Sequence, residues 1–306
     1  MNLRQLKYFV RVVEFGNLTR AADALHVAQP ALSQQMALLE DKLAVQLLVR
    51  GPKGVSPTVE GELLYRHAQI ILRQVDYTRS LMSRASDHIT GTVSIGLASS
   101  TARILALPLM RRVKEELPAI VLELVDIPSA DLTKFVLQGR IDFSLSPDQG
   151  PLNGLERDAV VREELLLIAP SSWKLPRRPR LTDIAGIPLI LPSPPNALRK
   201  RVDDAFLATA QTTNLYGEAS TSAILIPTVL AGMAATILPY SAAHLEIPQG
   251  LCVGYSMEPP LYRDLTLCLS TSLPPTPAVQ RVVKLCKEEM ARLVQEGSWR
   301  HAELLA

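Results

Sequence analysis

The sequence lacks the short motifs by which many enzyme active sites are recognised. It contains no Gly-x-Ser-x-Gly elbow, no P-loop, no His-Glu-x-x-His and no Gly-x-Gly-x-x-Gly. Its five histidines are scattered, and apart from His26 in an expected turn they fit surface or internally satisfied positions. We therefore expect no catalytic residue, no cofactor and no enzyme activity.

Cysteine is scarce. The three cysteines, Cys252, Cys268 and Cys286, are odd in number, and they lie far apart without the paired spacing of zinc or redox sites. This pattern indicates reduced thiols with a structural role in the cytoplasm, and it predicts no metal site.

The sequence also lacks a convincing membrane or export segment. Charged residues follow Met1 at once, where a signal peptide needs an apolar stretch. Residues 219–245 contain no Asp, Glu, Lys or Arg, but Pro227, Gly232 and Pro239 interrupt them. A helix followed by a strand inside an α/β core explains this segment better than a membrane span does. We expect a cytoplasmic protein without a membrane partner.

The excess of positive charge is small. The 306 residues carry a formal net charge of +2, which is low for a protein that only coats nucleic acid. The length predicts two or three domains, so DNA binding would be confined to one of them.

What is present begins with three short helical patterns. Leu3, Leu6, Phe9, Val10 and Val13 recur at steps of three and four, which predicts a first helix. Gly and Asn at positions 16 and 17 interrupt it. We expect a second helix over residues 20–25 capped by Thr19, and a third that begins at Gln29-Pro30, where proline suits the first turn.

The third helix has two distinct faces. Its apolar face carries Leu32, Met36, Leu39 and Leu43. Off that face, Ser33, Gln34 and Gln35 occupy the first half, whereas Glu40 and Asp41, which a phosphate backbone repels, occupy the second. This is the arrangement of a recognition helix that enters the major groove by its N-terminal end. By pattern alone, any small three-helix domain remains an alternative.

Residues 47–58 form two short extended runs around a tip rich in Gly, Pro and Lys, which predicts a β-wing. Arg50 and Lys53 place positive charge near that tip, where it suits a phosphate or the minor groove.

A long helix is expected from Pro57-Thr58 to about residue 87. Leu63, Ala68, Ile71 and Val75 belong to an apolar stripe along it. A helix of this length needs a partner for such a stripe. The partner is either the same helix of a second copy or the rest of its own chain.

From Gly91 the pattern alternates between strands and helices. This alternation predicts parallel sheets with helices on their faces, in two α/β units joined by two crossing strands with a cleft between them. Strands are expected at 92–97, 120–127, 142–145, 165–168, 188–191, 215–218, 235–238 and 263–269, and helices at 102–117, 130–138, 197–208, 222–230 and 277–295.

Three hydroxyls, Ser99, Ser100 and Thr101, are expected in a loop after the first of these strands. Ligands of open parallel sheets bind at the carboxyl ends of strands, near helix N-termini. The hydroxyls therefore suit a carboxylate or a similar anion, and the alternative is that one of them serves only to cap the following helix.

The N-terminal residues closely resemble the winged helix-turn-helix of LysR-type regulators. The resemblance runs through Leu6-Lys7-Tyr8-Phe9, Asn17-Leu18-Thr19-Arg20-Ala21-Ala22, Gln29-Pro30-Ala31-Leu32-Ser33-Gln34-Gln35, Arg50, Gly54-Val55, Pro57-Thr58 and Gly61. Leu48-Val49-Arg50 and Ser56-Pro57-Thr58 further resemble the nitrogen-assimilation-control branch, and Leu48 replaces the usual phenylalanine. The implied DNA contacts are Thr19, Gln29, Pro30, Ala31, Ser33, Gln34, Arg50, Lys53 and Thr58.

The rest of the chain resembles the effector-binding domain of the same family at Gly139-Arg140-Ile141-Asp142 and at residues 231–239. The resemblance implies two Rossmann-like α/β subdomains of periplasmic-binding-protein type. The predicted domains are 1–58 for DNA binding, 59–88 as dimerisation helix and 89–306 for effector binding, the last with subdomain I at 91–161 and 268–300 and subdomain II at 162–267. The implied effector contacts are Ser99, Ser100, Thr101, Ser144, Pro192, Ser193 and Thr221.

The family resemblance also implies partners: promoter DNA, a small organic anion as effector, further copies in a dimer of dimers, and RNA polymerase. The rival interpretation, a solute-binding protein without DNA, would require export and would leave residues 1–90 unexplained.

Overall fold

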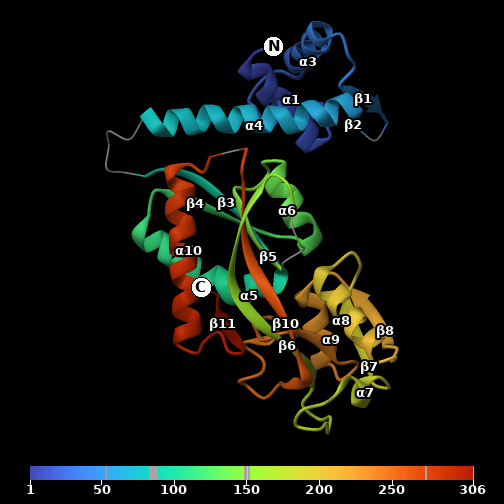
Figure 1. Cartoon of the computed structure of the whole chain (residues 1–306). Coiled ribbons are helices and arrows are strands. Elements are labelled where there is room, and N and C mark those ends of the chain that lie inside the picture. The colour runs from blue at the N-terminus through green and yellow to red at the C-terminus, as the bar shows by residue number, and fades with distance from the viewer. Residues whose placement is uncertain (53, 83–88, 148–149, 151, 273, 306) are drawn as a thin grey trace. The chain divides into compact units, whose positions relative to one another are not determined.

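The structure is a computed structural model that describes residues 1–52, 54–82, 89–147, 150, 152–272 and 274–305. The chain divides into two compact units (Figure 1). The first comprises Met1–Ala85 with Gln138–Arg140, and the second comprises Ser86–Leu137 with Ile141–Ala306. Each unit is described by itself.

The first unit consists of helices and one antiparallel hairpin, as the sequence predicts. Its core is built from the apolar faces of the first three helices, with Phe9, Leu32 and Leu39 fully buried. The elements are α1 (Leu3–Phe15), α2 (Leu18–Ala24), α3 (Gln29–Leu43), β1 (Leu48–Gly51), β2 (Gly54–Pro57) and α4 (Val59–Met82).

The start of α2 differs from the prediction. Asn17, not Thr19, is the N-cap, and its Oδ1 accepts hydrogen bonds from the amides of Thr19 and Arg20 at 2.9 and 3.1 Å. Asparagine is as good a cap as threonine, and a helix that starts two residues earlier has two of its first amides satisfied by the Asn17 side chain. The helix therefore begins at Leu18.

Helix α4 begins directly after the hairpin, held by Thr58. The Thr58 hydroxyl donates to the Gln46 carbonyl at 2.7 Å and accepts from the Gly61 amide at 2.9 Å. A Cβ atom at Gly61 would lie 2.1 Å from the Leu47 carbonyl oxygen, so only glycine permits this close approach. The predicted end of the helix, at about residue 87, falls outside the described residues.

The second unit contains a mixed sheet and a small parallel sheet. The order of the main sheet is β11-β6-β10-β5-β3-β4, with β9 paired to β6, while β7 pairs with β8. Its elements are β3 (Gly91–Leu97), α5 (Ser99–Glu116), β4 (Ile120–Asp126), α6 (Ser129–Leu137), β5 (Phe143–Pro147), β6 (Leu155–Pro170), α7 (Leu181–Ile184), β7 (Pro188–Pro192), α8 (Ala197–Ala208), β8 (Asn214–Ala219), α9 (Ser222–Leu230), β9 (Thr236–Pro239), η2 (Tyr240–Ala243), β10 (Cys252–Ser270), α10 (Pro277–Gln295) and β11 (Ala302–Leu304).

The bounds of α8, α9 and α10 confirm the helices predicted there. The prediction of purely parallel sheets is wrong. Among the strand pairs of the described residues, only β3–β4, β3–β5 and β7–β8 are parallel. The strands β6 and β10 are antiparallel and extend far beyond the apolar runs that predicted them. The first five residues of β6 are exposed or half-buried, so this part lacks the continuous apolar run of a buried strand.

These two long strands contribute to two separate apolar cores. One core contains Phe143, Val161 and Leu265, and the other contains Leu165, Leu189 and Ile226. Residues 219–245 supply α9 and β9 to the second core, as expected for that uncharged segment. No helix in the described part of the chain is long and apolar enough to cross a membrane.

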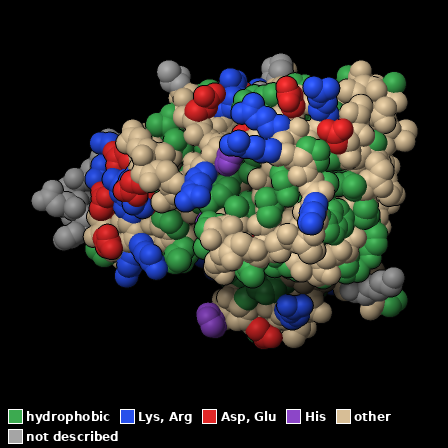
Figure 2. Space-filling view, turned by 90° about the horizontal axis from the view of Figure 1, so that it is seen from below, with side chains coloured by type: hydrophobic (Ala, Val, Ile, Leu, Met, Phe, Trp, Pro, Cys, Tyr) green, Lys and Arg blue, Asp and Glu red, His purple; other side chains and the backbone are tan. Residues whose placement is uncertain are grey.

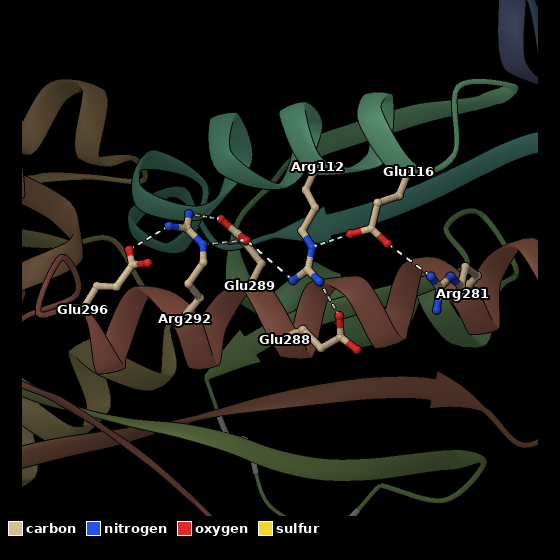
Figure 3. Close-up of polar contacts among 7 residues, drawn as sticks. All are labelled: Arg112, Glu116, Arg281, Glu288, Glu289, Arg292 and Glu296. Atoms are coloured by element: carbon tan, nitrogen blue, oxygen red, sulfur yellow. Dashed lines mark hydrogen bonds and ion pairs between the residues drawn. The ribbon is translucent and has the colours of Figure 1, made fainter.

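Helices α5 and α10 are joined by a ladder of alternating charges (Figure 3). Arg112 of α5 donates to Glu116 at 2.8 Å and to Glu288 of α10 at 2.5 Å. The buried Glu289 lies between Arg112 at 3.7 Å and Arg292 at 2.5 Å. The two helices are thereby fixed to each other outside the apolar core.

Candidate DNA interface and effector cleft

Helix α3 exposes the polar side chains that were predicted to contact DNA. Leu32, Met36 and Leu39 are buried, whereas Gln34 is exposed and Ser33 half-buried. The other predicted contacts on this helix are Gln29, which is half-buried, and Pro30 and Ala31, which are exposed.

The first turn of α3 has no side-chain cap. Its N-cap is Ala28, and Pro30 occupies the first turn. The positive end of the helix dipole therefore meets no capping side chain of its own, an environment that attracts phosphate. Gln35 points elsewhere, since its Oε1 accepts from Gln5 Nε2 at 3.3 Å.

Glu40 has a role that the sequence did not reveal. Its Oε1 accepts hydrogen bonds from the backbone amides of Leu47 and Leu48, at 2.8 and 3.0 Å. The carboxylate therefore fixes the entry to β1 rather than forming part of an acidic half that DNA would avoid. The signal was hidden because the partner amides lie seven and eight residues away.

The predicted wing is the hairpin β1–β2, in which Arg50 is paired with Val55 and exposed. The Val55 amide donates to the Gly16 carbonyl at 2.8 Å, which attaches the hairpin to the turn between α1 and α2. Lys53, at the tip, lies outside the described residues. Thr58 is half-buried at the base of the wing, with its hydroxyl bonded within the chain, and Thr19 is exposed on α2.

A small cleft, with a cavity volume of about 40 Å³, lies in the second unit between the two cores. The N-terminal ends of α5, α6, α8 and α9 border it, through Ser99, Ser129, Asn196 and Ser222. Helix N-termini carry partial positive charge, so their convergence favours an anion. The cleft is lined by Ala98, Ser99, Ser100, Ile127, Pro128, Ser129, Pro147, Pro192, Asn196, Leu198, Ser220, Ser222, Leu225, Leu238 and Arg263.

Three of the predicted effector contacts, Ser99, Ser100 and Pro192, thus line the cleft. The serines lie in the first turn of α5 rather than in a loop before it, and the N-cap, Ala98, makes no side-chain cap bond. Simple capping by one of these hydroxyls is therefore not what the structure shows.

The other predicted contacts do not line this cleft. Thr101 and Ser144 are fully buried, and Ser193 and Thr221 are half-buried beside lining residues. Side chains alternate between the two faces of a strand and rotate around a helix, so the neighbour of a lining residue in the sequence points to another side. The sequence analysis missed Asn196, Ser129, Ser222 and Arg263, which come from four separate elements.

Two hydrogen bonds cross this cleft. The Ser222 amide donates to Ser99 Oγ at 3.1 Å, and Asn196 Nδ2 donates to Ser129 Oγ at 3.4 Å. Burial raises the pKa of Asp126 at the end of β4, opposed by a hydrogen bond with Ser99. Any ligand that enters must therefore replace or rearrange polar contacts between the two sides.

Two family models match the chain. The model described as "Bacterial regulatory helix-turn-helix protein, lysR family" matches residues 3–62, and "LysR substrate binding domain" matches residues 86–291. The chain belongs to the LysR family of transcriptional regulators. This LysR-type regulator therefore has a DNA-binding helix-turn-helix and an effector-binding domain, as the sequence predicted.

Its curated relatives are transcription regulators. The nitrogen assimilation regulatory protein nac of Klebsiella aerogenes is 36% identical over 99% of both chains, and that of Escherichia coli K12 is 36% identical over 97% of both. The regulator BenM of Acinetobacter baylyi is 33% identical over 57% of each chain.

Solved structures share the fold. A full-length OxyR variant from Pseudomonas aeruginosa has a TM-score of 0.74 at 21% identity, covering 95% of this regulator and 94% of that chain. CbnR in complex with its target DNA has a TM-score of 0.67 at 23% identity, covering 94% of this regulator and all of that chain.

Proposed function

We propose that this LysR-type regulator contacts promoter bases through Ser33 and Gln34, with Arg50 and Lys53 of the wing on phosphates. The single observation that carries this assignment is that α3 has one buried apolar face and one polar face open to solvent. Its apolar face is buried, while the amide of Gln34 projects from the N-terminal half beside an uncapped helix end. Amide and hydroxyl groups at this place suit base edges in a major groove.

Gel retardation and footprinting on the region upstream of its own or a neighbouring gene test this proposal. The combined change Ser33→Ala and Gln34→Ala should weaken specific binding by about 1–3 kcal/mol per lost base contact. Asp41→Ala, on the exposed second half of the same helix, is the matched control and should not weaken binding. Equal affinity of the double variant and the wild type for the DNA would show that α3 does not read the bases as proposed.

We propose a small organic anion as the effector of the cleft. Convergent helix N-termini, serine hydroxyls and the Asn196 amide support this ligand class, because they supply donors, and Asp126, the carboxylate bonded to Ser99, does not line the cleft. The effector would replace the bonds that cross the cleft. It would thereby change the angle between subdomain I, at 91–161 and 268–300, and subdomain II, at 162–267.

Assembly is part of the proposed function. Helix α4 packs Tyr65 and Ala68 into its own unit, but Val59, Leu63 and Ile71 are exposed along one side. We infer that this side pairs with α4 of a second copy, and that two such pairs form a dimer of dimers. Bound to promoters in the cytoplasm, the assembly would act on RNA polymerase.

The nearly full-length similarity to two nitrogen assimilation regulatory proteins further supports target genes of nitrogen metabolism.

A further inference from the structure

A charged pair is buried where β6 and β10 lie side by side. Glu163 and Arg263 are register partners, and their side chains are only 1% and 5% exposed. Arg263 donates to the same oxygen, Oε2 of Glu163, from Nε at 2.8 Å and from Nη2 at 2.6 Å. A pair this deeply buried is costly unless further hydrogen bonds satisfy its remaining atoms.

The second carboxylate oxygen of Glu163 is satisfied from two other elements. Its Oε1 accepts from Ser241 Oγ at 2.6 Å and from Trp299 Nε1 at 2.9 Å. With three donor residues around it, the carboxylate is fixed in position and orientation.

Trp299 reaches Glu163 from the segment that follows α10. The ring is 1% exposed, and the Trp299 amide donates to the Leu293 carbonyl at 2.8 Å. Beyond it, the Glu164 amide donates to the His301 carbonyl at 2.8 Å, and β11 pairs with β6. The C-terminal segment is thereby attached to the strand that carries Glu163.

The other end of this chain of contacts is the cleft. Arg263 lines the cleft, and its Nη2 also donates to Ser100 Oγ at 2.8 Å. Its remaining nitrogen, Nη1, donates to none of the residues that the structure describes. Two N–H groups of a guanidinium are therefore still available on a residue of the cleft wall.

We propose that Arg263 is the cation that binds the effector's acidic group, and that Glu163 and Trp299 are positioning residues that aim it. Glu163 fixes the plane of the guanidinium, and Trp299 fixes Glu163. The C-terminal segment is then part of the specificity of the cleft, although it does not line it. This inference rests on the proposed anion-binding function of the cleft.

The chemistry favours a ligand with one carboxylate at this position. Glu163 already balances the charge of Arg263, so the guanidinium supplies directed hydrogen bonds rather than an unpaired charge. A fixed guanidinium loses little freedom when a carboxylate binds, whereas one that has lost its support must first be ordered.

The first test uses the full-length protein and thermal unfolding in sodium acetate and sodium succinate, with sodium chloride at equal ionic strength as reference. The wild type should gain stability saturably with one of the two carboxylates. Trp299→Phe keeps an aromatic ring but removes the N–H. This variant should need an anion concentration about tenfold higher to reach half of the maximal increase in melting temperature. Trp173→Phe, the matched control at the other tryptophan, should need the same concentration as the wild type.

A merely structural Trp299 would give a different result. Trp299→Phe would then lower the melting temperature in every salt but leave the anion-dependent increase and its half-saturation unchanged. That outcome overturns the proposal. Ser241→Ala removes the neighbouring donor to the same oxygen, and it should weaken the anion response in the same direction if Trp299→Phe folds poorly.

A second test needs no ligand. Ser100→Ala and Trp299→Phe alter opposite ends of the chain of contacts. Their joint effect on the unfolding equilibrium constant should differ about threefold or more from the product of the single effects. The effects of Ser100→Ala and Trp173→Phe on the unfolding equilibrium constant should simply multiply when the two changes are combined.

The two tests separate the possible failures. A multiplicative result for Ser100 and Trp299 overturns the positioning role whatever the anions do. Coupling between them, with no carboxylate response in the wild type, supports the positioning chain and counts against the proposed anion effector.

Discussion

At the scale of single residues, burial decides what the cysteines can do. All three lie inside the second unit, and burial raises the pKa of each thiol. The pKa of Cys252 rises to about 11 and that of Cys286 to about 12. The thiolate is the reactive form, so these side chains are poor nucleophiles in the folded protein.

We predict that the native protein reacts slowly with a disulfide reagent at pH 8, and that all three thiols react quickly in denaturant. Absorbance of the released thiolate measures both rates. A fast native reaction at any of the three would contradict the assigned burial. Because their pKa is raised by folding, the thiols favour the folded state fully near pH 7, and this contribution is lost as the pH rises above about 9.

Glu40 illustrates a second residue-scale point. In the sequence it is one of two acidic residues in the half of a helix that DNA was expected to avoid. In the structure it accepts two backbone amides and shapes the start of the wing. The chemistry of a carboxylate is the same in both interpretations, and only its surroundings distinguish them.

At the scale of elements, the ladder between α5 and α10 has one buried member. Glu289 is 2% exposed, while Glu288 beside it is 39% exposed. Both bind Arg112 (Figure 3). A buried carboxylate depends on its charged partners far more than an exposed one, which water screens.

We therefore expect Glu289→Gln to lower the free energy of unfolding by about 1.5–3 kcal/mol, because it removes charge-assisted hydrogen bonds inside the protein. Glu288→Gln is the control and should cost less than about 1 kcal/mol. Urea unfolding of both variants measures the difference. Equal losses of unfolding free energy in the two variants would mean that the burial of Glu289 does not add to the stability of the protein.

Helix α4 shows how one element can serve two partners. Its predicted apolar stripe divides, with Ala68 toward the core of its own unit and Leu63 and Ile71 exposed. Both partners considered from the sequence, its own chain and a second copy, are therefore compatible with this helix.

At the scale of the whole molecule, exposed apolar side chains are the candidates for the proposed contacts between copies. Figure 2 shows a face on which hydrophobic side chains gather on the right, while charged side chains lie mainly on the left and along the upper edge. Large exposed apolar patches on soluble proteins mark interaction sites. Exposed large side chains of the second unit include Leu107, Met110, Val121, Tyr216 and Ile224.

We predict that Leu63→Glu combined with Ile71→Glu weakens the association of copies through α4, because charges would then face each other across the pairing helices. Sedimentation at several protein concentrations measures the mass. Leu207→Glu, on an exposed site of α8, is the control for added charge and should leave pairing through α4 intact. An unchanged mass of the double variant would exclude α4 as the pairing surface.

The sequence by itself determined the local elements: the helix periods, the polar half of α3, the wing and the helices α8, α9 and α10. These follow from spacings within one element, which burial of a single face imposes. It also pointed to Ser99 and Ser100 as residues of the cleft wall, although it placed them in a loop rather than in the first turn of α5.

Only the tertiary structure decided which side chains share a site. Glu163, Arg263 and Trp299 are brought together by the antiparallel pairing of β6 with β10 and by a C-terminal segment folded against them. Thr101 and Ser144 looked like cleft residues but are buried, since a shift of one residue turns a side chain away. Strand pairing and helix phase depend on contacts between distant segments, and no local spacing encodes those contacts.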